Sequence, residues 1–344
     1  MHTVTRSTLL LTLALLLAIM PQAAAQNDKA LNLTAGTVGL SIGDSERTTG
    51  LRLNYRDRRM QWVHGVNMTL WSPPYDQTGG AVNGLALGIP VTGAAHIRGL
   101  AAGAGVGATE TISGVAVGAL GLGAGDNLDG LAVGGLGVGT GGSVRGILVA
   151  GLGAGAGEHL SGLVVSGLGV GSNGSVRGVM VAGVGAGAGG TMSGIGVAGV
   201  GMGVGGATRG LLAGGVAAGT GGDMTGILVG GLASGSGERM TGIMVGGLAS
   251  GASQVRGLAL GGVGTGARNV HGALVSAGYN RIEEGVMRGV AISGYNDMRG
   301  TQRGLAIGIY NYARTLHGLQ IGVLNVAQNN PRGFRVLPLV NANL

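Results

Sequence analysis

Arginine recurs at one position of this sequence, directly before a glycine that returns about every 16 residues. A guanidinium keeps its charge and carries five N–H donors, so a row of arginines suits the anionic groups of a polymer. If each repeat forms one coil, these side chains lie along one edge and form a basic stripe. The stripe comprises Arg98, Arg145, Arg177, Arg209, Arg256, Arg288 and Arg303. We predict that it binds an anionic polymer at a cell surface; the alternative is a solvated edge that only aids solubility.

Histidines and carboxylates show no grouping that predicts a catalytic or metal site. His64, His271 and His317 share the arginine position, whereas His96 and His159 stand apart, and this spacing does not suit metal ligation. Calcium-binding repeats need an aspartate in every copy, and here the aspartates are scattered. Acids and bases also do not gather as general acid–base catalysis requires. We therefore expect no catalytic residue, no metal and no cofactor.

Glycine-rich strings of the form GxGxxG are frequent, as in residues 151–157. They arise from the repeat itself and lack both a βαβ context and the later acidic residue of a dinucleotide site. We therefore expect neither a nucleotide nor a specific nucleic acid as a partner.

The repeat is what must position the arginines. A glycine that follows a polar residue recurs from Gly84 to Gly333 in steps of 14 to 17 residues, mostly 16, as expected for a stacked array. Within each copy most apolar residues lie two apart, which places them on one face of a strand. The sequence predicts a parallel β-solenoid and favours one copy per coil. The alternation of arginine and serine before the motif glycine leaves open a second arrangement, with two copies per coil on opposite sheets. The interior of the solenoid should hold the apolar residues Ile147, Val149, Leu152, Ala154 and Leu160 and their equivalents. The glycines of 151–157 should form corners with positive φ.

The same repeat also permits a second fold, an outer-membrane β-barrel. A unit of 16 residues could be a strand of about ten residues plus a turn, arranged as an up-and-down meander. The glycine-rich lipid face and the lack of aromatic girdles count against this alternative. Composition does not favour an ordinary globular core, because 80 of the 344 residues are glycine and only 3% are aromatic.

The chain ends predict export and capping. Residues 1–25 resemble a signal peptide: Arg6 precedes an apolar run, and Ala23–Ala25 provide a cleavage site before Gln26. Residues 26–83 should form an N-terminal cap with irregular repeats, residues 84–331 the glycine-rich array, and residues 332–344 a C-terminal cap in which Phe334 covers the open end.

Late copies carry asparagine in place of glycine. Asn296, Asn311 and Asn325 fall in one column of the repeat. We expect them to hydrogen-bond along a ladder at a stacked corner, where asparagine tolerates left-handed backbone.

The chain has no cysteine, so its stability cannot depend on disulfides, and removal of Arg6 with the signal leaves a net charge near +6. Export without cysteine is typical of a bacterial envelope. The predicted location is therefore the outer membrane, the cell surface or the extracellular space.

The last copies, GLAIGIYNYA at Gly304 and GLQIGVLNVA at Gly318, resemble the GLQIGxxN-type repeats of bacterial glycine-rich surface-repeat proteins, which are best known from leptospires. TTGLRLNYRDR at 48–58 and the closing VLPLVNANL look like the ends of such a protein. The middle copies depart from this pattern, because alanine and glycine replace the glutamine and asparagine. The resemblance implies an exported, envelope-associated protein and supplies no catalytic residues.

We therefore expect a non-enzymatic structural or interaction protein, a repeat rod for surface display or adhesion, with anionic surface polymer or envelope components as partners. The alternatives are the outer-membrane β-barrel and, third, a polysaccharide-acting β-helix enzyme.

Overall fold

The computed structural model describes residues 29–71 and 79–343, so the predicted signal peptide, residues 1–25, lies outside the described part. The described elements are β-strands and one short 3-10 helix, η2 (Arg332–Phe334). The chain divides into two compact units, Met1–Thr140 (unit 1) and Gly141–Leu344 (unit 2).

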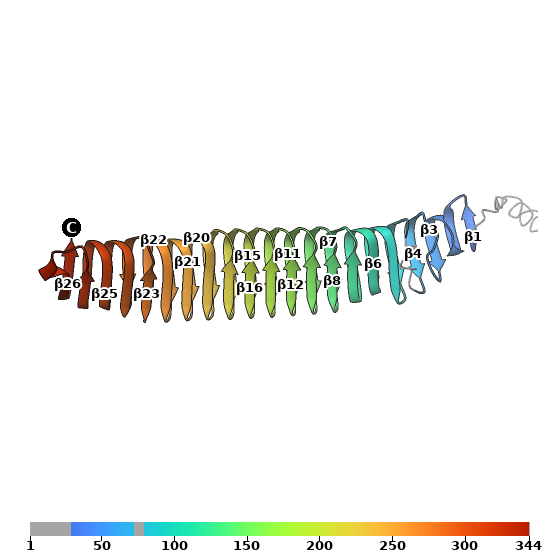
Figure 1. The fold of residues 1–344 in the computed structure, drawn as a ribbon. Helices are drawn as coiled ribbons and strands as arrows, with labels where there is room; N and C mark the ends of the chain where they lie inside the picture. The colour runs from blue at the N-terminus through green and yellow to red at the C-terminus, as the bar shows by residue number, and fades with distance from the viewer. Residues whose placement is uncertain (1–28, 72–78, 344) are drawn as a thin grey trace, which may run out of the picture. The chain divides into compact units, whose positions relative to one another are not determined.

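Unit 2 is a parallel β-solenoid in which a strand of seven residues alternates with a strand of four (Figure 1). Long strands pair only with long strands and short strands with short strands. The long strands are β9 (Val144–Ala150), β11 (Leu160–Ser166), β13 (Val176–Ala182), β15 (Met192–Ala198), β17 (Thr208–Gly214), β19 (Met224–Gly230) and β24 (Val286–Ile292). The short strands are β10 (Gly153–Ala156), β12 (Gly169–Ser172), β14 (Gly185–Ala188), β16 (Gly201–Val204), β18 (Ala217–Thr220) and β23 (Tyr279–Ile282).

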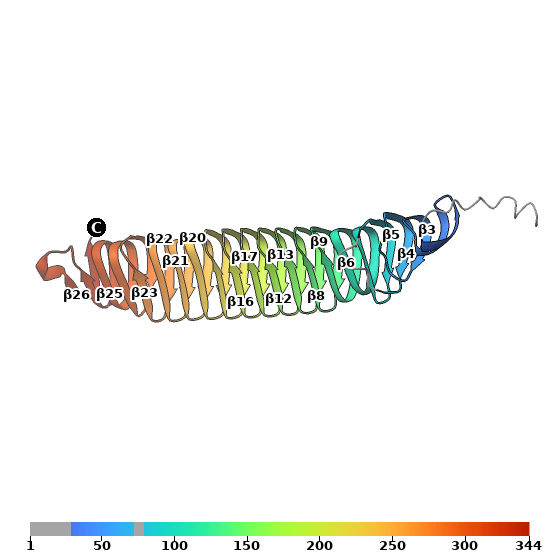
Figure 2. The same cartoon turned by 45° about the vertical axis from the view of Figure 1, so that its right-hand side comes forward.

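In several coils the two strands join through the corner. The continuous strands are β20 (Ala233–Gly246), β21 (Ala249–Gly261), β22 (Gly264–Ser276) and β25 (Tyr295–Ala327). Figure 2 shows the two layers of each coil, with β13 and β17 in one and β12 and β16 in the other.

The register confirms the predicted stacking. Gly162 of β11 lies opposite Gly146 on one side and Gly178 on the other, all in parallel strands. One motif copy therefore makes one coil. Parallel pairing of every neighbouring copy excludes the up-and-down meander that the sequence also permitted.

Unit 1 has the same plan with longer and less regular strands. Its strands are β1 (Lys29–Ala35), β2 (Val38–Asp44), β3 (Arg47–Asn54), β4 (Trp62–Thr69), β5 (Ala81–Gly88), β6 (Val91–Ala124), β7 (Asn127–Gly134) and β8 (Gly137–Thr140). Strands β2 to β6 pair in parallel, whereas β1 folds back on β2 as an antiparallel hairpin.

The predicted interior was wrong for the long strands. Val144, Leu148 and Ala150 are buried, whereas Ile147 and Val149 point outward, 42% and 38% exposed. The predicted set has the wrong phase, because both faces of these strands are apolar and alternation alone does not say which is buried. Residues on one face of a strand are two apart, so Arg145, Ile147 and Val149 lie on the same face. Because Arg145 is exposed, that face points outward.

The other three predicted interior positions do not all agree with the prediction. Leu152 lies in the turn after β9 and is 49% exposed, so its placement inside was wrong. Ala154 of the short strand and Leu160 at the start of the next long strand are buried, as predicted.

Positive φ occurs at another glycine than predicted. Gly153 and Gly155 lie within β10 rather than at corners. The left-handed position is the motif glycine of each long strand: Gly162 has φ of 130°, and a Cβ built there would lie 1.9 Å from the carbonyl oxygen of Gly146 in the preceding coil. Glycine is required there by both conformation and space.

The asparagine ladder forms as predicted, but inside the coil. The Nδ2 of Asn280 donates to Asn296 at 3.0 Å, Asn296 donates to Asn311 at 2.8 Å, and Asn311 donates to Asn325 at 2.7 Å. All four side chains are fully buried and none of their residues has positive φ, so the expected left-handed corner was wrong.

The C-terminal strand covers the last long-strand segment. Strand β26 (Val336–Asn343) pairs antiparallel with the end of β25, from Gly318 opposite Asn343 to Val326 opposite Val336. This pairing satisfies backbone groups that an open edge would leave free. Phe334 is 61% exposed, so the prediction that it covers the open end was wrong.

Unit 1 holds a buried ion pair where the coils of unit 2 have apolar residues. Arg52, fully buried, donates to Asp57 and, at 2.9 Å, to Asn67. Burial by itself would raise the pKa of Asp57, but the charge of Arg52 and hydrogen bonds from Thr69, Arg52 and Asn67 hold this pKa below its ordinary value. Each charge has hydrogen-bond partners, and the cluster holds the first coils together.

Candidate interaction surfaces

The arginine position of unit 2 forms one continuous column on the outer face of the long strands. The register connects each member to the next through β9 to β25. We call it the arginine column: Arg145, Ser161, Arg177, Ser193, Arg209, Thr225, Thr241, Arg256, His271, Arg288 and Arg303. Its six arginines are exposed, and among these described positions none is acidic. The structure thus brings together six of the seven predicted stripe residues.

The seventh predicted residue, Arg98, lies in unit 1, where it precedes Gly99 in the equivalent register position and pairs with Asn83. The histidines follow the predicted pattern in part. His271 joins the column between Arg256 and Arg288 and is within 2.9 Å of the Arg288 guanidinium, and His64 occupies the same register position in β4.

A cleft of about 310 Å³ opens beside the arginine column. Its lining includes the side chains of Arg145 and Arg177, with Ser161 between them, and His159 and Ser175 from the adjoining corners. His159 Nδ1 accepts a hydrogen bond of 3.1 Å from the backbone N–H of Ser175, which orients the ring. Guanidinium groups and hydroxyls together form a set of donors that suits a phosphate or sulfate group.

Two apolar columns run beside the arginine column on the same outer face. The isoleucine column consists of Ile147, Leu163, Val179, Ile195, Leu211, Ile227, Ile243, Leu258, Ala273, Val290 and Leu305. The valine column consists of Val149, Val165, Val181, Val197, Ala213, Val229, Val245, Leu260, Val275, Ile292 and Ile307. Sequence reasoning placed both columns in the core and therefore missed this surface.

A third row of exposed apolar side chains lies in the turn after each long strand. It consists of Leu152, Leu168, Val184, Val200, Val216, Leu232, Leu248 and Val263, which are 41% to 59% exposed. Their backbones hydrogen-bond in sequence, as in Leu168 N–H to Leu152 O at 3.0 Å. We call this row the turn column.

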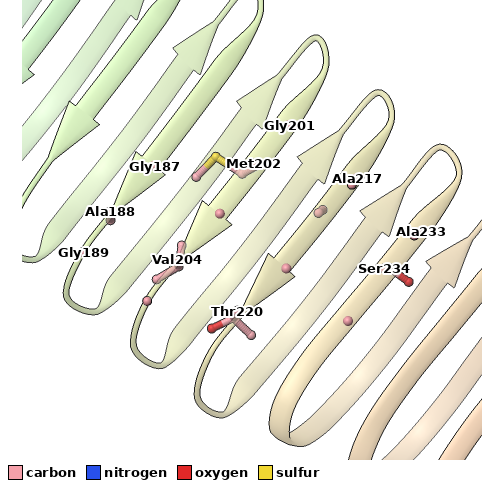
Figure 3. A pocket seen from close by; sticks show the side chains of 15 residues that line it. Gly187, Ala188, Gly189, Gly201, Met202, Val204, Ala217, Thr220, Ala233 and Ser234 are labelled. Atoms are coloured by element: carbon pink, nitrogen blue, oxygen red, sulfur yellow. The ribbon is translucent and has the colours of Figure 1, made fainter.

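The outer face of the short strands is almost bare. A shallow groove of about 920 Å³ there is lined by Gly187, Gly201 and Gly203 and their neighbours, which come from successive short strands (Figure 3). A Cβ built at Gly201 or Gly203 would meet nothing within 4 Å. The stacking of coils therefore does not require glycine at these two positions.

Near the C-terminus this bare face gives way to tyrosines. The rings of Tyr279 and Tyr295 lie 5.2 Å apart, and those of Tyr295 and Tyr310 lie 4.9 Å apart. The Tyr279 hydroxyl donates to Asp297 at 2.8 Å, and Arg299 pairs with the same carboxylate at 3.0 Å. Burial and the hydrogen bond to Asp297 raise the pKa of Tyr279. Because these tyrosine rings pack on one another, they stabilise the stacking of the last coils.

Charge is distributed unequally between the two units. Unit 2 contains 13 arginines against 6 acidic residues, a balance of +7 that equals the formal net charge of the whole chain. Unit 1 is therefore neutral as a whole, and the basic character of the protein belongs to the unit that carries the arginine column.

The residues that the structure describes contain no cluster of three or more histidine, aspartate or glutamate side chains placed to hold a metal ion. Within the same residues, no helix has the length and apolar character needed to cross a bilayer. No protein-family model, no curated protein and no solved structure matches the chain.

Proposed function

We propose that this protein is a non-enzymatic, exported repeat scaffold of the bacterial envelope, which uses its arginine column to bind an anionic surface polymer or another envelope component. The observation that carries the proposal is the column itself: six exposed arginines in one register across the coils of unit 2. The arginines form a discontinuous row in which one to three coils separate each from the next, so their charges lie in one line that an extended anionic polymer can follow. The predicted signal peptide and the resemblance to surface-repeat proteins support the envelope location.

Retention on a heparin column tests the binding role. Arg145, Arg177, Arg209 and Arg256 are replaced by glutamine in one variant. The matched control carries the same change at four arginines of unit 2 outside the column: Arg268, Arg299, Arg314 and Arg332. Both variants lose four charges, so a difference between them reports the column rather than net charge. We expect the column variant to elute at clearly lower salt than the control. Elution of the two variants at the same salt concentration would show that the arginine column does not determine binding, and would contradict the proposal.

Export is tested separately. The full chain is expressed in a Gram-negative host, and the envelope, medium and cytoplasm are separated. We expect a processed chain that begins at Gln26 in the envelope or the medium. An unprocessed chain confined to the cytoplasm would contradict the proposed location.

A further inference from the structure

The outward apolar face of unit 2 lies outside the buried core of the coils. The side chains of Ile195, Ile227 and Ile243 are 40% to 44% exposed, whereas Leu212 and Leu228 on the inward face of the same sheet are fully buried. Each of these isoleucines thus keeps about two fifths of its surface in water, and burying that surface would require an external partner. A surface that is apolar at the same position in nearly every coil therefore indicates an external contact.

The apolar area on this face is larger than the apolar patches that most monomeric proteins expose. Neighbouring coils lie about 4.8 Å apart, so the eleven members of the isoleucine and valine columns extend over roughly 50 Å. From Ile147 in the strand to Leu152 in the turn that follows it, the chain covers up to about 16 Å. The resulting patch, on the order of 800 Å², is larger than the 300–600 Å² patch of a typical monomer.

The arginine column beside the apolar columns indicates which kind of partner covers this face. The arginine column lies two residues from the isoleucine column in each strand, on the same face, and its described members include no carboxylate. A second copy packed on this face would bring arginines against apolar or arginine columns, and the columns themselves would provide no carboxylate. An anionic bilayer offers both required chemistries at once, acyl chains for the apolar columns and phosphates for the guanidinium groups beside them.

We propose that the long-strand face of unit 2 lies on an anionic lipid bilayer, with its isoleucine and valine columns at the boundary of headgroups and acyl chains and its arginine column on the lipid phosphates. The cleft between Arg145 and Arg177 provides a place for one phosphate at this border. The inference deepens the proposed function by naming the partner, and it rests on the envelope location given there.

Co-sedimentation with vesicles tests the proposal on the processed chain. Vesicles of phosphatidylcholine with a minority of phosphatidylglycerol are compared with pure phosphatidylcholine. The test variant combines Ile147→Thr, Ile195→Thr, Ile227→Thr and Ile243→Thr, which keep β-branched residues in exposed strand positions. The control variant introduces the same residue at Gly153, Gly171, Gly201 and Gly203 on the other sheet, where a Cβ would meet nothing within 4 Å. Circular dichroism verifies that both variants keep the strand content of the parent.

We expect the parent and the control to bind the anionic vesicles more tightly than the neutral ones, and the isoleucine variant to bind at least about tenfold more weakly than the parent. The isoleucine variant should still be retained on heparin, because the arginine column is intact. Vesicle binding by the isoleucine variant equal to that of the parent would overturn the proposal.

Two further outcomes would also overturn it while leaving the proposed function standing. In the first, no form binds vesicles although the arginine column still governs retention on heparin. In the second, the parent forms dimers in solution that the isoleucine variant lacks, again without vesicle binding, which would make the face an interface between copies of the chain.

Discussion

Two glycines of one coil should respond in opposite ways to the same substitution. Gly162 lies in the long strand with φ of 130°, and a Cβ there would lie 1.9 Å from the carbonyl oxygen of Gly146. Gly171 lies in the short strand, outside the left-handed region, and its Cβ would meet nothing within 4 Å. Gly162→Ala and Gly171→Ala therefore add the same methyl group to two different environments.

The magnitudes follow from these environments. A residue other than glycine held in an unfavourable backbone region costs about 1–3 kcal/mol, and forcing the neighbouring backbone apart costs about 1–3 kcal/mol more. Gly162→Ala should thus lower the free energy of unfolding by roughly 2–6 kcal/mol. Gly171→Ala relieves the entropic cost of glycine in a strand and should raise that free energy by about 0.5–1 kcal/mol.

Urea unfolding followed by circular dichroism measures both variants against the parent. Because stacked coils need not unfold as one unit, the comparison is made between midpoints of the first transition that involves unit 2. Equal midpoints for the two variants, or a higher midpoint for Gly162→Ala than for Gly171→Ala, would refute the assignment of the left-handed position to the motif glycine.

Three further predictions test the interior. Leu148→Ser should lower the free energy of unfolding by about 2–5 kcal/mol because the side chain is fully buried, whereas Val149→Ser should change it by less than about 1 kcal/mol; urea midpoints compare them. Asn296→Leu breaks the ladder, because it removes the hydrogen bond that Asn280 donates to Asn296 and the one that Asn311 accepts from it, so it should cost about 1–3 kcal/mol in the same assay. Because the folded-state pKa of Asp57 lies below its ordinary 3.8, the stability from its pairing with Arg52 is full above that pH and is lost as pH falls through the folded-state pKa. The difference in thermal midpoint between the parent and Asp57→Asn should therefore be large near neutral pH and shrink well below pH 3.8; a constant difference would count against the ion pair.

The sequence predicted the architecture because the length of one repeat equals the length of one coil. Motif glycines such as Gly146 and Gly162, 16 residues apart, become register partners in neighbouring coils. The arginine column and the asparagine ladder followed from the same spacing. Stacked coils convert equal intervals into columns, so a repeated residue type predicts a repeated neighbour.

The sequence did not give the correct side for the apolar columns, because a strand with apolar residues on both faces has two possible orientations. The signal that decides between them was present: Arg145 shares the parity of Ile147 and Val149, and an exposed charge fixes that face outward. The buried Arg52 in unit 1 shows why this rule needs its context. That side chain lies inside because Asp57 and Asn67 satisfy it, and no local pattern shows those contacts.

Cysteine pairing tests most directly whether one copy of the repeat makes one coil. The chain has no cysteine of its own, so any disulfide that forms must join the two introduced cysteines. Val149 and Val165 are register partners, about 4.8 Å apart, within the distance that a disulfide spans, whereas Val149 and Val181 are two coils, or about 9.6 Å, apart. Under mild oxidation the double variant at 149 and 165 should form an intramolecular disulfide rapidly, and the variant at 149 and 181 should remain reduced. A disulfide that forms at 149 and 181 but not at 149 and 165 would contradict the stacking.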